Sequence, residues 1–146
     1  MTAPCPPGRL FAALENLDDY PGWLTIVDRA VPAEAIEGDE GPVWQVDLRG
    51  RIGPLSRSKR LRMVRTVHEA PHRLRFERRE VDGRRHSAWT LLAEIAAGPD
   101  GPADLGSQVR ISLHYGGSFG GALLERMLVD EIEASRPRLL ERVAAG

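Results

Sequence analysis

The sequence has few of the features that tie a protein to a membrane or to secretion. Cys5 is the only cysteine among 146 residues, so no internal disulfide can form and a reducing, cytoplasmic location is expected. No apolar run approaches the roughly 20 residues that span a bilayer. The N-terminus has neither the basic start nor the apolar core of a secretion signal. We therefore expect a cytoplasmic protein with no stable membrane insertion.

The chain also lacks an excess of charge of either sign. Twenty basic and 21 acidic residues give a net charge of −1, so no overall field attracts nucleic acid or an anionic membrane. Arginines are concentrated between Arg57 and Arg85, where they alternate with apolar residues. This alternation is typical of the solvent-facing side of a sheet rather than of a phosphate-binding patch, and no nucleic-acid partner is expected.

Alternation of apolar and polar residues dominates the middle of the chain. In residues 43–51, for example, Trp44, Val46 and Leu48 share one side of a strand. Short connections, including Gly53-Pro54, Ala70-Pro71 and Asp82-Gly83, predict an antiparallel meander in which each strand pairs with the next. The predicted strands are residues 25–35, 43–51, 59–69, 72–81, 86–96 and 107–116.

Helical spacing appears at both ends of this meander. Residues 9–17 predict a first helix, which the segment from Asp18 to Gly22 must interrupt. A long amphipathic helix is predicted from Phe119 to Val143, with a kink or break near Ser135 because of Pro137. Its buried stripe is predicted to comprise Leu124, Leu128, Ile132, Leu139 and Val143. The length and pattern indicate one α+β domain, residues 1–146, whose curved sheet and closing helix can enclose a cavity.

The segment Asn16-Leu17-Asp18-Asp19-Tyr20-Pro21-Gly22-Trp23-Leu24 resembles a motif of the polyketide cyclase/dehydrase branch of the START-like (Bet v 1-like, SRPBCC) superfamily. The Pro6-Pro7 lead-in and the C-terminal helix agree with this resemblance, which covers roughly residues 4–143. It implies a helix-grip fold, in which a curved antiparallel sheet wraps around a long C-terminal helix, with two short N-terminal helices. Members bind lipids, sterols, polyketides or other hydrophobic molecules, and some are cyclases or aromatases.

The first strand of this family has little sequence available here. Only Met1 to Cys5 precede the Pro-Pro lead-in. A missing strand would leave an unpaired sheet edge that could pair with another chain, so either a monomer or a homodimer is compatible with the sequence.

Two motifs are better explained by structure than by chemistry. His68-Glu69-Ala70-Pro71-His72 matches the zinc-protease pattern HExxH, but Pro71 and the flanking strand alternation predict a strand–turn–strand corner, and no metal is expected. The glycine-rich segment 116–121 lacks the lysine of a phosphate-binding loop and is interpreted as a hinge. His86 and His114 occupy polar positions on their strands and are predicted to lie on the surface, with a general-base role as the alternative.

Strand alternation selects candidate residues for the lining of the cavity. Arg65 falls on the inward side, where a buried arginine is costly unless paired, so it would suggest an anionic or carbonyl ligand group unless a bulge turns it outward. Tyr115 and Ser87 share the inward side, and Arg78 is a weaker candidate. The predicted ligand-binding residues are Trp23, Trp44, Met63, Arg65, Phe76, Ser87, Trp89, Tyr115, Leu124 and Leu128.

No set of nucleophile, base and orienting group is evident, and no cofactor is expected. The leading hypothesis is a carrier or sensor of a small hydrophobic ligand. The alternative is a polyketide cyclase or aromatase-type enzyme in which Arg65 and Tyr115 polarise a carbonyl and transfer a proton. A third possibility is an interaction module that uses the open sheet edge.

Overall fold

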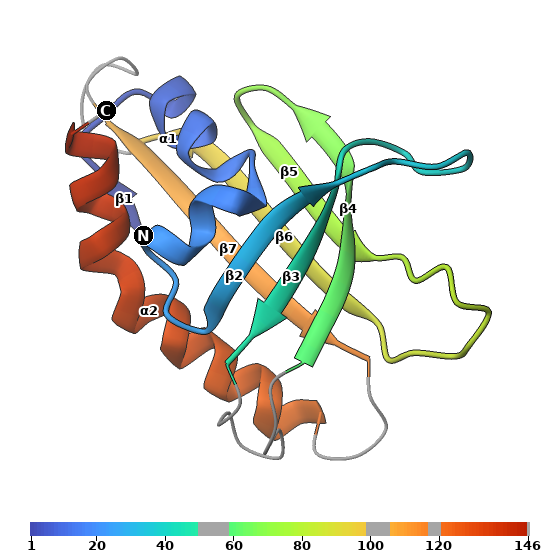
Figure 1. Cartoon of the computed structure of the whole chain (residues 1–146). Helices are drawn as coiled ribbons and strands as arrows, with labels where there is room; N and C mark the ends of the chain where they lie inside the picture. Colours follow the sequence, from blue (N-terminus) through green and yellow to red (C-terminus); the bar gives the residue numbers. More distant parts are fainter. Residues whose placement is uncertain (50–58, 99–105, 117–120, 146) are drawn as a thin grey trace.

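A computed structural model describes residues 1–49, 59–98, 106–116 and 121–145. In this part of the chain, seven strands form one antiparallel sheet in the order β1-β7-β6-β5-β4-β3-β2. The long helix α2 crosses one face of the sheet, and the two N-terminal helical segments lie on the same side (Figure 1). The elements are β1 (Thr2–Ala3), α1 (Pro7–Leu14), η1 (Leu17–Gly22), β2 (Val27–Ala33), β3 (Val43–Leu48), β4 (Lys59–Glu69), β5 (Arg73–Arg78), β6 (Trp89–Ala97), β7 (Ser107–Tyr115) and α2 (Gly121–Ala145).

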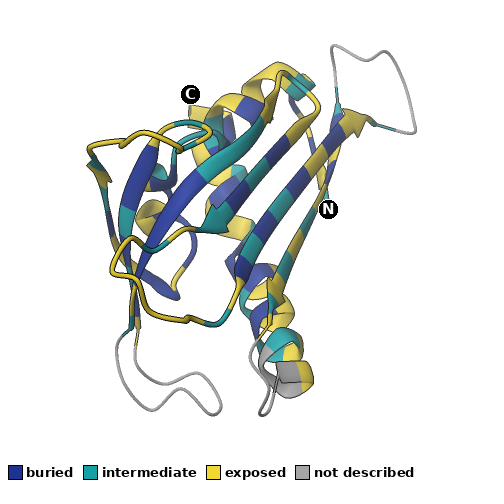
Figure 2. Ribbon diagram, turned by 90° about the vertical axis from the view of Figure 1, so that its right-hand side faces the viewer, coloured by how far each residue is buried: buried dark blue, intermediate teal, exposed yellow. Residues whose placement is uncertain are grey.

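The predicted alternation produces a sheet with one buried face. Along β6, Trp89, Leu91, Ala93 and Ile95 are buried, whereas the residues between them are half-buried or exposed. Figure 2 shows the same banding on neighbouring strands. Because the inner faces of the strands and the buried side of α2 share one hydrophobic core, the arrangement is the predicted helix-grip fold.

The first strand is present but very short. Thr2 and Ala3 pair with the beginning of β7, and Val109 of β7 exchanges main-chain hydrogen bonds with Met1. The segment before the Pro-Pro lead-in therefore forms a strand, as the family resemblance implies. It covers only one end of β7, which leaves β1 two residues long.

The connection between β5 and β6 differs from the prediction. Asp82-Gly83 indicated a tight hairpin, but β5 ends at Arg78 and β6 begins at Trp89, which leaves ten residues between them. The carboxylate of Asp82 accepts hydrogen bonds from the Arg84 main-chain N–H and from the His86 ring, so local polar contacts replace the strand ladder there. The predicted turn at Gly53-Pro54 and residues 99–102 of the predicted loop lie outside the described residues.

The helices follow the prediction with two corrections. The first helix ends at Leu14. The segment from Asp18 to Gly22, which was expected to interrupt it, belongs to a separate 3-10 helix, η1 (Leu17–Gly22), which contains Pro21. Of the expected kink or break near Ser135, the break does not occur, because α2 continues through Pro137. Because proline has no N–H, Pro137 cannot donate the usual helical hydrogen bond to the carbonyl of Glu133. Glu133 is exposed, so water can donate to this carbonyl instead. The axis of α2 changes direction along its length (Figure 1).

Candidate functional site

An apolar cavity of about 50 Å³ lies between the inner face of the sheet and the segment that contains η1. Strands β3, β4, β6 and β7 supply one wall, and residues from η1 to the start of β2 supply the other. Its lining exposes no polar surface. The lining residues are Leu17, Tyr20, Leu24, Ile26, Val27, Val46, Leu48, Leu61, Met63, Trp89, Leu91 and Leu113.

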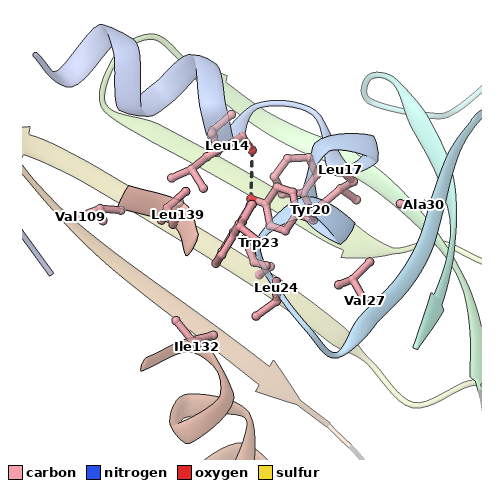
Figure 3. Close-up of a cluster of buried hydrophobic side chains, with 14 of the residues drawn as sticks. Leu14, Leu17, Tyr20, Trp23, Leu24, Val27, Ala30, Val109, Ile132 and Leu139 are labelled. Atoms are coloured by element: carbon pink, nitrogen blue, oxygen red, sulfur yellow. Dashed lines mark hydrogen bonds between the residues drawn. The ribbon is translucent and has the colours of Figure 1, made fainter. Parts of the chain in front are cut away.

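Aromatic side chains from the family-like segment close one side of this interior. Tyr20 and Trp23 pack with their ring centroids 5.0 Å apart, and both are almost completely buried (Figure 3). The Tyr20 hydroxyl donates a hydrogen bond of 3.0 Å to the carbonyl oxygen of Leu14. Burial raises the pKa of the Tyr20 phenol well above its ordinary value. The negative charge of Asp19 raises this pKa further, by a smaller amount. Tyr20 is therefore a neutral structural group.

Most of the predicted apolar site residues lie in the core. Met63 and Trp89 line the cavity, whereas Trp44 and Phe76 pack edge to face beside it, 5.7 Å between centroids. The Trp44 indole N–H donates to the carboxylate of Asp18 across 2.7 Å. Trp23 and Leu128 are fully buried in the same cluster. The side chain of Leu124 lies outside the described residues.

Arg65 is half-buried and forms contacts that the sequence did not suggest. Its Nη1 donates to the carbonyl oxygen of Glu15 at the end of α1, and its guanidinium lies 5.9 Å from the centre of the Trp44 ring. Desolvation lowers the pKa of Arg65, and Glu15 partly opposes this effect. A register shift does follow Arg65 in β4, but the side chain still reaches the N-terminal helix. The structure therefore gives Arg65 a partner within the protein.

The two other polar candidates, Tyr115 and Ser87, lie at the end of β7 and just before β6. Tyr115 is half-buried and packs on Trp89, with ring centroids 4.9 Å apart, while its main-chain N–H donates to Glu125 of α2. Ser87 precedes β6 rather than lying within it, and its hydroxyl accepts a hydrogen bond from Lys59 across 3.5 Å. Tyr115 and Trp89 are thus paired on adjacent strands, and Ser87 lies two residues before Trp89, on the β6–β7 side of the sheet.

Lys59 was missed at the sequence level, although two signals could have found it. It is the only lysine in a chain with 20 basic residues. It also shares the strand side of Leu61 and Met63, which both line the cavity. The Lys59 ammonium lies 5.9 Å from the centre of the Trp89 ring. Desolvation by burial lowers the pKa of Lys59, and the positive charge of the nearby Arg78 guanidinium lowers it further.

The other polar features of the sheet face outward or serve the fold. A shallow depression of about 490 Å³ on the outer face is bordered by exposed charged residues, among them Glu69, Arg73 and Arg110. In the HExxH segment, His68 lies near the end of β4 and pairs with Glu15, while His72 lies in the following turn, so the strand–turn–strand prediction is confirmed.

No helix in the described ranges is long and apolar enough to span a membrane.

Solved structures with this architecture are similar over nearly the whole chain. A START superfamily protein from Mycobacterium smegmatis aligns with a TM-score of 0.69 and 13% identity, covering 99% of this chain and 94% of that one. A protein from Deinococcus radiodurans aligns with a TM-score of 0.56 and 16% identity, covering 97% and 95%. A protein from Arthrobacter aurescens aligns with a TM-score of 0.52 and 14% identity, covering 98% and 80%. At these identities the likeness establishes the fold.

No curated protein sequence matches the chain significantly. A family described as polyketide cyclase / dehydrase and lipid transport, however, matches residues 1–144. Since that match spans nearly the entire chain and the curved sheet with its closing helix agrees with the START fold, the protein belongs to this polyketide cyclase / dehydrase and lipid transport family.

Proposed function

We propose that the protein binds a small hydrophobic molecule between its sheet and the helical cover, and acts as a carrier or sensor of that molecule. The observation that carries this proposal is the cavity whose walls expose only apolar surface, in a domain of this family. Apolar walls bind by removing apolar ligand surface from water, which contributes about 25 cal/mol for each Å² buried.

Occupancy of the cavity requires its walls to move. The described residues enclose about 50 Å³, whereas small-molecule sites typically measure about 300–1,000 Å³. The wall opposite the sheet includes η1, a single short 3-10 helix, which is more easily displaced than a strand held by ladders on both sides. We expect the ligand to select or induce a wider arrangement of this wall.

Binding is favoured over catalysis because of the contacts of Arg65. The enzyme alternative assigns carbonyl polarisation to Arg65, but its Nη1 donates to the Glu15 carbonyl. Tyr115, the proposed proton donor, lies three strands away from Arg65, on β7, where it packs on Trp89. The contacts of Arg65 and of Tyr115 have no residue in common, and the lining of the cavity exposes only apolar surface.

The test is a titration of the purified protein with 1-octanol, followed by ¹H–¹⁵N spectra. We expect saturable shifts at cavity residues such as Leu91, with a dissociation constant on the order of 0.1 mM if most of the chain's CH₂ groups are buried. Native mass spectrometry with extraction of copurifying molecules then identifies the natural ligand. Shifts confined to the outer face of the sheet would overturn the proposal.

Two tryptophan substitutions on the same strand provide a matched comparison. Leu113→Trp places a bulky side chain in the cavity lining, and Ser112→Trp places the same side chain on the exposed face. Leu113 is only half-buried, so the larger residue can be accommodated. We expect Leu113→Trp to weaken 1-octanol binding at least about tenfold, because it removes the ligand's volume. Ser112→Trp should bind like the natural protein.

A further inference from the structure

Two polar side chains, Lys59 and Ser87, lie beside Trp89, which belongs to the wall of the cavity. Lys59 begins β4 next to the cavity residue Leu61, and the structure places Ser87 and Trp89 beside it. The start of β4 lies beside the end of β3, where Leu48 pairs with Lys59 (Figure 1). We call Lys59, Ser87 and Trp89 the Lys59 cluster.

The ammonium of Lys59 forms no ion pair within the part of the chain that the structure describes. Arg60, its neighbour on the outer face, pairs with Asp47, but Lys59 makes no ion pair with any described residue. Among the residues outside the described ranges, 50–58 and 117–120 contain no aspartate or glutamate, and the acidic residues are Asp100 and Asp104. The Glu80 carboxylate partly opposes the lowering of the Lys59 pKa, but it is bound to the guanidinium of Arg78 across 2.7 Å. Asp28 and Asp47 border the same surface depression as Lys59, and they pair with Arg49 and Arg60.

Arg78 differs from Lys59 because its hydrogen-bonding capacity is used. Its guanidinium is 6% exposed and contacts the Glu80 carboxylate, the Ser87 carbonyl oxygen and the His86 ring. Arg78 therefore holds the Ser87 backbone in place. This leaves the Ser87 hydroxyl and the Lys59 ammonium as the donors that can face a ligand.

A third donor belongs to the cavity wall itself. Trp89 lines the cavity and is 2% exposed, yet its indole N–H has no hydrogen-bond partner among the described residues. The lining of the cavity exposes no polar surface, so this N–H becomes accessible only when the walls move to admit a ligand. A buried N–H without a partner costs about 1–3 kcal/mol, and a ligand acceptor that reached it would remove this penalty as well as add a bond.

We propose that the Lys59 cluster binds the carboxylate of an amphipathic ligand whose apolar body occupies the cavity. A carboxylate accepts hydrogen bonds through both oxygens and carries one negative charge, which matches an ammonium, a hydroxyl and an indole N–H. The apolar lining continues directly from Trp89 through Leu91 and Leu61. This inference rests on the proposed function and adds the chemical class of the ligand's polar end.

The test compares octanoate with 1-octanol, which share an eight-carbon chain and differ in the head group. At neutral pH and low salt, we expect octanoate to bind about tenfold more tightly than 1-octanol, because it adds a charge-assisted hydrogen bond. The Trp89 indole resonance should shift with octanoate. Lys59→Met should abolish this preference, while Lys59→Arg should retain part of it.

A matched control is Arg60→Met, which removes the adjacent positive charge on the outer face of β4. It should keep the preference for octanoate. Equal binding of the two probes by the natural protein would overturn the carboxylate site but leave the hydrophobic-ligand proposal intact. If 1-octanol fails to bind at the cavity, the proposed function itself is wrong. An octanoate preference that survives in Lys59→Met would assign the head group to another residue.

Discussion

The Nη1 atom of Arg65 in β4 lies 2.8 Å from the carbonyl oxygen of Glu15, the residue that follows the last turn of α1. Carbonyl groups at the end of a helix lack intrahelical partners and carry partial negative charge, so a cation there is stabilising. The contact joins residues that are 50 positions apart in the sequence. It anchors the N-terminal helical segment, which forms part of the cover over the cavity, to the sheet.

Arg65→Met should therefore destabilise the fold rather than act on the ligand alone. We expect the free energy of unfolding to fall by about 2 kcal/mol, because a charged hydrogen bond is lost and the Glu15 carbonyl loses a partner. Urea denaturation measures this change. Arg73→Met, on the exposed face of β5, should stay within about 0.5 kcal/mol of the natural protein. Weaker ligand binding with unchanged stability would instead indicate that Arg65 contacts the ligand.

The ion pair between Arg62 and Asp39 should be important for stability. Its two side chains are each 6% exposed and lie 2.7 Å apart. Removing one partner of a buried pair costs about 3–5 kcal/mol, so Asp39→Ala should lower the free energy of unfolding by about 3 kcal/mol. Asp28→Ala breaks the exposed pair with Arg49 and should cost less than about 1 kcal/mol. Similar losses in both variants would contradict this assignment.

The same ion pair predicts a direction for acid unfolding. The hydrogen bond from Arg62, with a further one from the Ile36 main-chain N–H, lowers the pKa of Asp39 below its ordinary value. Stability from this carboxylate is present above its unfolded pKa of about 3.9 and is lost as the pH falls through the lower folded pKa. Asp39→Asn should show a shallower decline of stability in that acid range, measured by urea denaturation at successive pH values.

Tyr20 should remain un-ionised while the protein is folded. Its pKa is raised by burial, so stability from its neutral form is complete below the unfolded pKa of about 10 and is lost only as the pH rises through the folded value. In a Tyr115→Phe variant, Tyr20 is the only remaining tyrosine. We expect its tyrosinate absorbance at 295 nm to appear together with the loss of circular dichroism. Ionisation with intact structure would contradict the buried position.

Lys59→Met should leave the fold intact and stabilise it slightly. Burial lowers the pKa of Lys59 in the folded state, so the protonated side chain destabilises the fold at pH values below this folded-state pKa. The destabilisation disappears as the pH rises towards the unfolded pKa of about 10.4. The melting temperature of Lys59→Met at neutral pH should equal or exceed that of the natural protein, and the difference should shrink at alkaline pH. A clear decrease would mean that the Lys59 side chain contributes to packing.

Local sequence patterns determine most of this fold. Apolar residues at alternate positions place one face of each strand in the core, and β4 occupies residues 59–69 as that pattern predicts. The helical spacing of Leu128, Ile132 and Leu139 likewise orients α2 against the sheet. The same rule identified Met63 and Trp89, which line the cavity.

Other parts of the site could not be predicted from such patterns. Alternation places Arg65 on the inner side but does not reveal that α1 ends within its reach. Ser87 lies in a ten-residue connection where strand alternation no longer applies, and its contact with Lys59 depends on the path of that connection. The cavity residues Leu17, Leu24 and Ile26 come from a segment with no strand pattern of its own.

The sequence by itself therefore determined the antiparallel meander, the closing helix and the side of the sheet that is buried, because these depend on residues close together in the chain. Only the tertiary structure decided that Arg65 anchors a helix and that Lys59, Ser87 and Trp89 meet beside the cavity. The physical reason is that ion pairs, desolvation and the presence or absence of a hydrogen-bond partner depend on distances between residues that are remote in sequence. Only the folded chain sets these distances.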